Sequence, residues 1–306
     1  MEDVLIIGGG VGGLNAALIL SRVRRRVLVV DSGRPRNASA QQVHGFVSLD
    51  GTPPAELLAA GRAEVERYGG RVVAGEVCTV RRYGDGMGAS FEVELTDRRV
   101  RTRRLIVATG LRDELPDLPE LRERWARDVL HCPYCHGWEV RDQPLGVLGW
   151  KPGAAHMALL LRQLSDDVVF FAEVLDAEIL DDVSRARLTA RGVRIVDARV
   201  SGLVVEDDQL RGVRLADGTV VARSALFVPP RFVPNDALLT SLGCEQYDSG
   251  WVRVDASGLT SVPGVWAVGN VVDSGAQVIN AAAAGATAAR AVHMDLIEDE
   301  LLEQAR

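Results

Sequence analysis

A glycine-rich loop between a buried strand and a helix is the feature that most constrains the fold of this 306-residue chain. The segment contains, in order, an apolar run at 4–7, the glycine-rich loop 8–13, an apolar helix expected at 14–20 and a second apolar run at 27–30. Gly8, Gly10 and Gly13 have the G-x-G-x-x-G spacing, and Asp31 follows the second run at the offset of a ribose-binding acid. This context predicts a dinucleotide-binding unit for a flavin or a nicotinamide cofactor.

A second strand–loop–helix pattern begins at 145–150. Its loop reads Gly149-Trp150-Lys151-Pro152-Gly153-Ala154, so that it lacks one glycine of the phosphate-binding pattern. Proline residues punctuate the chain on both sides of this unit and indicate two linkers, at 116, 119, 229 and 230. We therefore expect a separate middle domain.

The last part of the chain does not continue the second pattern. It contains an apolar strand at 264–268 and an alanine-rich helix that begins near residue 277. We expect it to return to the first domain. The prediction is an α/β fold of two Rossmann-like, three-layer domains, formed by 1–113 with 231–306 and by 114–230.

Composition excludes several classes of partner. Hydrophobic residues make up 47% of the chain, as in globular proteins, and the net charge of −7 with a pI near 5.4 argues against nucleic acid. No apolar run is long enough to span a bilayer, and the first residues lack the basic start of a secretory signal. We expect a cytoplasmic protein that binds neither nucleic acid nor membrane.

Two of the four cysteines form a C-x-x-C motif, Cys132-Pro133-Tyr134-Cys135. The other two, Cys78 and Cys244, are isolated, which does not fit a secreted disulfide framework. In a cytosolic protein this motif indicates redox chemistry or metal binding. We interpret the pair as redox-active and the isolated cysteines as inert buried thiols.

The histidines beside the motif allow two readings. His131 or His136 would complete half of a zinc site, but a closed zinc site needs four ligands and the remaining cysteines are isolated, so we expect no metal. An imidazole next to a reactive thiol is also a suitable acid and base near neutral pH. We predict that role for His136, with a structural role or His131 as the alternatives.

The chain resembles the low-molecular-weight thioredoxin reductase family of flavoproteins over essentially its whole length. Four features match in order: the first glycine loop with Asp31, Ala108-Thr109-Gly110, the C-x-x-C motif in the middle domain, and Val268-Gly269-Asn270 before the terminal helix. The resemblance implies a homodimer, an FAD domain formed by both ends of the chain, and a nicotinamide domain in the middle. It also implies that Cys135 faces the flavin and Cys132 exchanges with substrate.

The same resemblance implies FAD as the cofactor. The residues expected to bind it are Gly8, Gly10, Gly13, Asp31, Asn37, Thr109, Gly110, Gly269, Asn270 and Gln277. Asp31 would accept hydrogen bonds from the ribose, Gln277 would lie against the isoalloxazine, and Asn270 replaces the family's ribityl-binding aspartate. For Asn37, a turn role is an equal alternative.

The middle loop departs from the family. Lys151 stands where the second glycine allows close approach of a pyrophosphate, and Pro152 removes another amide donor. The segment 171–176 contains Glu173 and Asp176 but no arginine, so it would repel a 2′-phosphate. We expect NADPH binding to be lost or weakened, while NADH, another phosphate ligand or a second flavin remains open.

With these departures, the chain resembles the FAD-dependent dithiol oxidases of gliotoxin- and holomycin-type compounds. Those enzymes also have a His-Gly pair after the second cysteine, which is Cys135-His136-Gly137 in this chain. We expect a small dithiol to be oxidised to a disulfide through Cys132, Cys135 and FAD, with dioxygen as acceptor. The alternative is a disulfide reductase acting on a thioredoxin-like protein, with NADH, ferredoxin or another donor. A flavin-bound redox sensor without turnover is a third hypothesis.

Three further residues are weaker candidates. Trp138 and Trp150 would line a substrate cleft, but single aromatic residues more often pack in a core, and we interpret both as packing residues. His44 follows a polar loop and is a candidate for the flavin surroundings.

Overall fold

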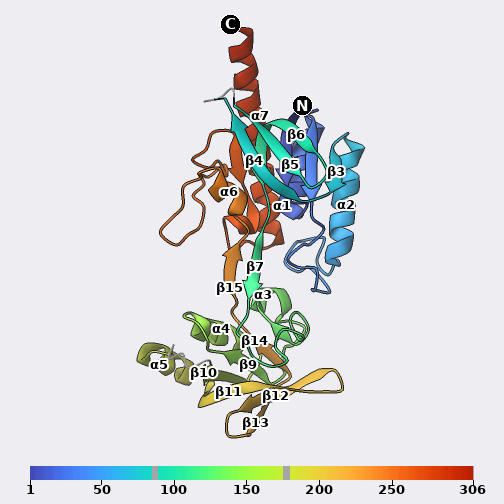
Figure 1. The fold of residues 1–306 in the computed structure, drawn as a ribbon. Coiled ribbons are helices and arrows are strands. Elements are labelled where there is room, and N and C mark those ends of the chain that lie inside the picture. The colour runs from blue at the N-terminus through green and yellow to red at the C-terminus, as the bar shows by residue number, and fades with distance from the viewer. Residues whose placement is uncertain (85–88, 175–179, 306) are drawn as a thin grey trace. The chain divides into compact units, whose positions relative to one another are not determined.

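The computed structural model describes residues 1–84, 89–174 and 180–305 (Figure 1). The chain forms two compact units. Unit 1 comprises Met1–Ala38, Phe46–Arg112 and Phe232–Arg306, and unit 2 comprises Ser39–Gly45 and Asp113–Arg231. The short segment Ser39–Gly45 thus belongs to unit 2 although both of its flanks belong to unit 1.

Unit 1 is built on a mixed sheet with the strand order β3-β2-β1-β6-β5-β4, in which β16 also pairs with β6. The strands are β1 (Glu2–Ile7), β2 (Val27–Asp31), β3 (Arg71–Ala74), β4 (Val77–Tyr83), β5 (Ser90–Leu95), β6 (Arg99–Val107) and β16 (Val265–Ala267). The parallel strands β1 and β2 are apolar runs because both of their faces are buried. The β4–β5–β6 part is antiparallel.

The helical elements of unit 1 are α1 (Val11–Arg22), α2 (Pro54–Arg67), α6 (Ala237–Ser241), the 3-10 turn η2 (Gly269–Val271) and α7 (Val278–Gln304). Helices α1, α2 and α7 cover one face of this sheet. One apolar core joins α1, α2 and α7 to the sheet, and a second lies on the opposite face. Within the described ranges, no helix is long and apolar enough to cross a membrane, and this includes α7 (red in Figure 1).

Helices α1 and α7 pack backbone to backbone. A Cβ atom on Gly285 would lie 2.1 Å from the Gly12 carbonyl oxygen, and one on Gly12 would lie 3.1 Å from that of Ala281. The Asn15 side chain donates a hydrogen bond to the Ala282 carbonyl oxygen at 2.6 Å. Because Gly12 and Ala281 are in the first turns of their helices, the two helix N-termini lie side by side.

A buried ion-pair cluster fixes the C-terminal half of α7 to β6. Arg104 is only 1% exposed in its side chain, and it pairs with Asp295 at 2.7 Å and with Asp299 at 3.1 Å. Arg103 pairs with Asp299 at 3.0 Å and with Glu300 at 2.7 Å. Hydrogen bonds from arginine side chains hold the pKa of the Glu300 carboxyl below its usual value.

Unit 2 contains a second mixed sheet, with the order β13-β12-β11-β10-β9-β14-β8. Its strands are β8 (Val129–Leu130), β9 (Leu145–Leu148), β10 (Val168–Glu173), β11 (Arg194–Glu206), β12 (Gln209–Leu215), β13 (Val220–Ala222) and β14 (Ala225–Phe227). Helices α3 (Pro133–His136), α4 (Ala154–Leu161) and α5 (Asp182–Ala190) complete the unit. Apolar cores lie on both faces of the sheet.

Apart from the Ser39–Gly45 segment, the chain passes between the units after Arg112 and after Arg231. Strands β7 (Leu111–Glu114) and β15 (Arg231–Pro234) span these two points and pair in a two-stranded sheet. Each unit thus has a largely parallel sheet and a strand–glycine-loop–helix motif. The prediction of an α/β fold with two Rossmann-like domains is confirmed.

Candidate active site

The glycine loop of unit 1 has the geometry of a phosphate-binding turn. Gly8 has φ +109°, and a Cβ there would lie 2.3 Å from the Ala108 carbonyl oxygen. A Cβ on Gly13 would lie 2.0 Å from the Gly8 carbonyl oxygen, so this glycine lets α1 approach the loop. Gly10 differs, because a Cβ there would have no protein atom within 4 Å. Gly10 therefore borders open space at the start of α1.

Gly10 gives a sharp prediction. Its backbone, with φ −73° and ψ 177°, is accessible to alanine, so we expect Gly10→Ala to fold normally but to lose most of its FAD. The new methyl group would occupy the space into which a pyrophosphate fits. The measurement is the flavin absorbance per chain after dialysis, together with the melting temperature of the apoprotein. A variant that keeps full FAD content would contradict the assignment of this loop.

Asp31 is the last residue of β2, and both of its carboxylate oxygens accept hydrogen bonds. Oδ2 accepts from Arg62 Nη2 at 2.6 Å, and Oδ1 accepts from the Gly33 backbone N–H at 3.2 Å. Arg62 lies on α2, and the sequence analysis did not single it out. Arg62 orients the Asp31 carboxylate, which is expected to accept hydrogen bonds from the ribose hydroxyls.

Thr109 and Gly110 follow β6 and are tied to Asn235. The Thr109 hydroxyl donates to the Asn235 carbonyl oxygen at 2.8 Å, and the Asn235 side-chain amide donates to the Thr109 carbonyl oxygen at 2.9 Å. The Asn235 backbone N–H donates to the Gly110 carbonyl oxygen at 3.0 Å. These bonds give Thr109 a defined structural role, in addition to the flavin contact that the resemblance implies.

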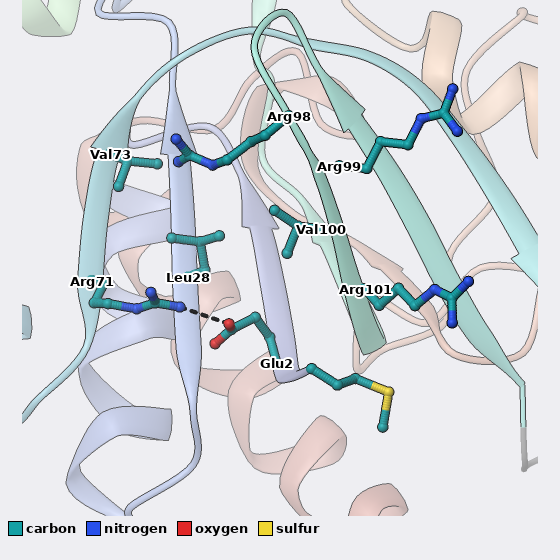
Figure 2. Close-up of a pocket in the computed structure, with 9 residues that line it drawn as sticks. Glu2, Leu28, Arg71, Val73, Arg98, Arg99, Val100 and Arg101 are labelled. Atoms are coloured by element: carbon teal, nitrogen blue, oxygen red, sulfur yellow. Dashed lines mark hydrogen bonds and ion pairs between the residues drawn. The ribbon is translucent and has the colours of Figure 1, made fainter.

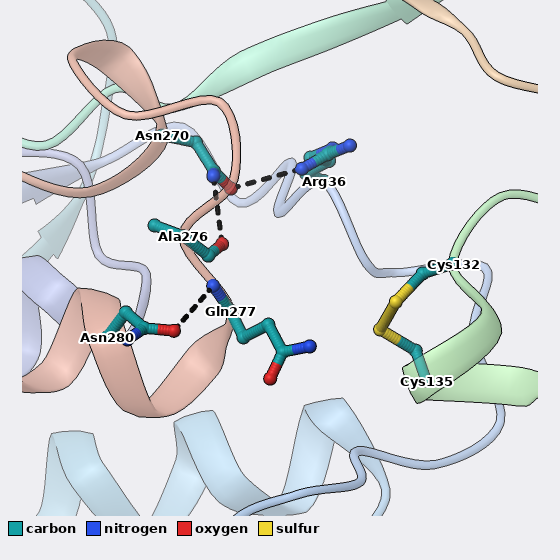
Figure 3. The surroundings of a disulfide bond; sticks show 7 residues. All are labelled: Arg36, Cys132, Cys135, Asn270, Ala276, Gln277 and Asn280. Carbon is teal, nitrogen blue, oxygen red and sulfur yellow. Dashed lines mark hydrogen bonds between the residues drawn. A yellow bond between two sulfur atoms is a disulfide. The ribbon is translucent and has the colours of Figure 1, made fainter. Parts of the chain in front are cut away.

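Asn270 lies in the turn η2, which begins at Gly269 with φ +73°. Its amide nitrogen donates to the carbonyl oxygens of Asp273 at 2.9 Å and Ala276 at 3.0 Å, and its oxygen accepts from Arg36 at 3.2 Å (Figure 3). A carboxylate could not donate these two bonds. The amide therefore explains why asparagine suits this chain where the family has aspartate.

Gln277 is the N-cap residue of α7. Its backbone N–H donates to Asn280 Oδ1 at 3.1 Å as part of a capping box (Figure 3). Asn37 lies in a turn that the bond from the Ala38 N–H to the Pro35 carbonyl oxygen closes at 3.0 Å. The turn role for Asn37 is thus present in the structure, and its contact with a flavin stays a prediction.

Taken together, these residues of unit 1 fit FAD. The N-cap of α1 has no side-chain hydrogen bond, so its first N–H groups point toward the open space beside Gly10. The N-terminus of α7 lies next to that of α1. Both helix dipoles favour a negatively charged pyrophosphate there, and α1 adds amides that no side chain caps.

In unit 2, Cys132 and Cys135 form a disulfide on the one-turn helix α3 (Figure 3). Cys132 is the N-cap residue, and its carbonyl oxygen accepts from the N–H groups of Cys135 and His136, both at 3.1 Å. A Cβ on Gly137 would lie 2.3 Å from Leu164, so this glycine lets α3 pack closely against the end of α4. The disulfide is therefore held on a short, well-packed turn.

His136 is largely shielded from water beside the disulfide. Burial lowers the pKa of its imidazole below the usual 6.5, the nearby Glu139 carboxylate raises it, and His44 lowers it further. At pH 7 the imidazole is therefore mainly neutral and able to accept a proton. His44 Nε2 lies 3.5 Å from Glu139 Oε1. The sequence did not reveal that His44 belongs to this unit.

The aromatic residues of α3 and its continuation are exposed. The Tyr134 side chain is 71% exposed and that of Trp138 is 66% exposed, so the interpretation of Trp138 as a packing residue was wrong. The Arg141 guanidinium stacks on the Trp138 ring at 3.9 Å. Trp150 is half-buried and packs against a core of unit 2, as expected.

The two isolated cysteines differ from each other. Cys244 is buried, and burial raises the pKa of its thiol. Cys78 is exposed on the edge strand β4, so the expectation that it is buried was wrong. In the described part of the chain, no three His, Cys, Asp or Glu side chains are grouped to hold a metal ion.

The glycine loop of unit 2 is hydrogen-bonded through its own side chains to the backbone that follows β14. Trp150 Nε1 donates to the Pro229 carbonyl oxygen at 2.7 Å, and Lys151 Nζ donates to that of Pro230 at 2.8 Å. These prolines follow β14, which pairs with β9 on the side opposite to β10. This position is the topological switch point where dinucleotides bind in open α/β sheets. Both side chains therefore bridge the ends of β9 and β14, where a nicotinamide dinucleotide would be expected to bind.

A separate cavity of about 510 Å³ lies in unit 1 (Figure 2). Its lining includes apolar residues and four arginines. Each arginine is paired with an acid: Arg71 with Glu2 at 2.6 Å, Arg98 with Asp97 at 3.0 Å, Arg99 with Glu94 at 3.2 Å and Arg101 with Glu92 at 3.3 Å. These pairs neutralise the rim, so the cavity has no charge that would select an anion.

Comparisons with known proteins agree with this geometry. Residues 2–285 match the family model described as pyridine nucleotide-disulphide oxidoreductase. Thioredoxin reductase tcpT of Claviceps purpurea (strain 20.1) is 34% identical over 314 residues, which cover 97% of this chain and 95% of that protein.

Two solved structures extend the comparison. The crystal structure of HlmI has a TM-score of 0.96 and 56% identity, covering 100% of this chain and 95% of that one. The putative thioredoxin reductase TrxB from Bacillus anthracis has a TM-score of 0.90 and 29% identity, covering 98% and 100%. The resemblance to thioredoxin reductase-like flavoproteins is confirmed. The chain belongs to the pyridine nucleotide-disulphide oxidoreductase family, as an FAD-dependent, thioredoxin reductase-like oxidoreductase that acts on sulfur groups.

Proposed function

We propose that this flavoprotein oxidises a small dithiol to a disulfide and passes the electrons to dioxygen. The observation that carries the proposal is the side-chain bridge in unit 2, in which Trp150 and Lys151 occupy the switch point while the same unit keeps the Cys132–Cys135 disulfide. Electrons then have an entry through thiols but no evident entry through a nicotinamide. Glu173, exposed at the end of β10, adds a negative charge where a 2′-phosphate would be bound. Asp176 lies outside the described residues.

The disulfide performs the exchange in two steps. A substrate thiolate attacks Cys132 Sγ, breaks the bond to Cys135 and releases the Cys135 thiolate. The second substrate thiol loses its proton and attacks the substrate sulfur of the mixed disulfide, so that the product disulfide leaves and Cys132 is reduced. The two electrons of the dithiol now reside on the cysteine pair.

FAD, when bound, supplies the acceptor for this electron pair and its transfer to dioxygen, which yields hydrogen peroxide with the two protons released by the substrate. Gly8, Gly10 and Gly13 would admit its pyrophosphate to the start of α1, and Asp31 would accept from its ribose. Gln277 would lie against its ring system. His136, neutral at pH 7, accepts the thiol proton as the thiolate forms.

The proposal includes the assembly and location that the resemblance implies, a cytoplasmic homodimer. Its supports are the isolated positions of Cys78 and Cys244, which do not form a secreted framework, and the similarity to thioredoxin reductases over the whole chain. Light scattering of the purified protein tests the dimer: a mass near twice the 33.0 kDa of one chain is expected.

A second candidate is reduction of a thioredoxin-like protein, because curated relatives such as tcpT bear the name thioredoxin reductase. It requires NADH, ferredoxin or another donor in place of NADPH. Anaerobic reduction of the purified flavoprotein separates the two. Under the oxidase proposal, a dithiol should bleach the flavin spectrum and air should restore it. Under the reductase proposal, a dedicated electron donor should be needed to bleach it.

A further inference from the structure

Arg36 connects three separate segments of unit 1. It lies half-buried in the turn 35–38, which follows β2. Its Nη1 donates a hydrogen bond to Asn270 Oδ1 at 3.2 Å (Figure 3), and its guanidinium carbon lies 5.2 Å from the centre of the Phe232 ring on β15. No pattern in the sequence singles out this arginine, because both of these partners lie far from it along the chain.

The loop that Arg36 contacts leads directly into α7. The Asn270 amide nitrogen donates to the carbonyl oxygens of Asp273 and Ala276, which closes the loop just before the N-cap residue Gln277. Because the nitrogen is used inside the loop, the amide oxygen is the atom that accepts from Arg36. Arg36 thus holds the amide in the orientation in which it supports the backbone before α7.

The same contact places a positive charge next to the region that fits FAD. The N-terminus of α7 lies beside that of α1, where Gly10 borders open space. Segment 269–277 contains a single acid, Asp273, which is exposed and accepts from the Gly275 N–H at 2.9 Å. The Arg36 guanidinium is a permanent cation, and its partial burial leaves less water to screen it from a neighbouring anion.

We propose that Arg36 is an FAD-positioning residue, which orients Asn270 at the start of α7 and strengthens binding of the anionic cofactor by its charge. The effect should be larger for reduced FAD, because the reduced ring carries a negative charge near neutral pH that the oxidised ring lacks. The Phe232 ring holds the guanidinium in place by a cation–π contact. Arg36 therefore raises the reduction potential of the bound flavin. Neither effect requires that the substrate is a dithiol.

The experiment compares Arg36→Met and Arg36→Lys with the wild type in the complete FAD-bound protein. We expect Arg36→Met to raise the dissociation constant for FAD about tenfold or more, and to lower the midpoint potential of the flavin. Arg36→Lys keeps the charge but loses the planar fork, so it should restore most of the potential and only part of the affinity. Flavin fluorescence on dilution measures the affinity, and a spectral titration with a reference dye measures the potential.

Arg34→Met is the matched control. Arg34 lies two residues before Arg36 and pairs with Glu76 at 2.5 Å, with 71% of its own side chain and 62% of that of Glu76 exposed. The variant removes the same charge from the same segment, yet it should change neither the FAD affinity nor the midpoint potential. A lowered potential in Arg36→Met alone would support the proposal.

A purely structural role for Arg36 gives a different pattern. Arg36→Met would then lower the melting temperature but keep the wild-type midpoint potential, and this result would overturn the proposal. An equal loss of potential in Arg34→Met would also overturn it. If Arg36→Met does not fold or retains no FAD, Phe232→Leu decides, because it removes only the ring beneath the guanidinium: a smaller loss of both affinity and potential supports the proposal, and wild-type values refute it.

Discussion

Replacing Cys135 with serine should lower dithiol-dependent oxygen consumption by at least about 1000-fold, because a serine hydroxyl can neither close the disulfide nor accept an electron pair from Cys132. Cys132→Ser should lose activity to the same extent. The two variants should differ in the mixed disulfide that they trap. With a disulfide form of the substrate, Cys135→Ser should accumulate a mixed disulfide at Cys132, since no partner thiol remains to resolve it. Oxygen-electrode rates and intact-protein mass spectrometry measure both effects.

The matched control is Cys78→Ser, which removes an exposed thiol of unit 1 that is bonded to no other cysteine. It should retain wild-type turnover. A mixed disulfide that forms at Cys135 in the Cys132→Ser variant, and not at Cys132, would reverse the roles given to the two cysteines. Substantial oxygen consumption in both serine variants would show that electrons bypass the disulfide.

Replacing Arg104 with methionine should lower the free energy of unfolding by about 3 kcal/mol, because it removes the buried cation that Asp295 and Asp299 share and leaves Asp299 only its pair with Arg103. Arg104 is 1% exposed and pairs with Asp299, which is 5% exposed, and with Asp295. Urea denaturation followed by tryptophan fluorescence measures the change, and Trp266 is buried within the same unit. The double variant Arg104→Met/Asp299→Leu should recover part of the loss.

The control for this effect is Arg185→Met, which breaks an exposed pair with Asp197 at 2.7 Å. Its expected change is below about 1 kcal/mol, as for other solvated ion pairs. If Arg104→Met is no more destabilising than Arg185→Met, the cluster does not fasten α7 to β6. In that case the placement of the α7 N-terminus rests on its contacts with α1, which are the close Gly12–Gly285 approach, the Asn15–Ala282 hydrogen bond and the shared apolar core.

Local patterns were sufficient for the fold and for the outline of the cofactor loop. The spacing of Gly8, Gly10 and Gly13 predicts a turn in which one glycine avoids a clash with Ala108 and another lets α1 pack closely. The loss of the second glycine at Lys151 predicted an obstructed nicotinamide loop. The structure adds a bridge from Trp150 and Lys151 to the backbone after β14, which no local pattern encodes.

Contacts between distant segments could not be predicted in this way. His44 reaches Glu139 only because the segment around it joins unit 2, and Arg62 reaches Asp31 only because α2 packs beside β2. For Asn270, the family comparison suggested a cofactor contact, while the structure shows that its amide also holds its own loop. For these residues, the sequence showed only the residue type and did not indicate which side chain each would contact.

Exposure was the property predicted least well from residue type. Trp138 was interpreted as a packing residue and Cys78 as a buried thiol, yet both are exposed. Cys78 lies on the edge strand β4, whose outward-facing side chains meet solvent. Trp138 follows a helix of only one turn that has no buried residue of its own.

The most direct test of the proposed function is an anaerobic titration of the purified yellow protein with NADPH, NADH and dithiothreitol, followed by admission of air. We expect dithiothreitol alone to bleach the flavin absorbance, and air to restore it with formation of hydrogen peroxide. We expect NADPH and NADH to leave the spectrum unchanged, because Trp150 and Lys151 bridge the ends of β9 and β14 where either would bind. Rapid bleaching by NADPH would contradict the account and identify the chain as an ordinary thioredoxin reductase.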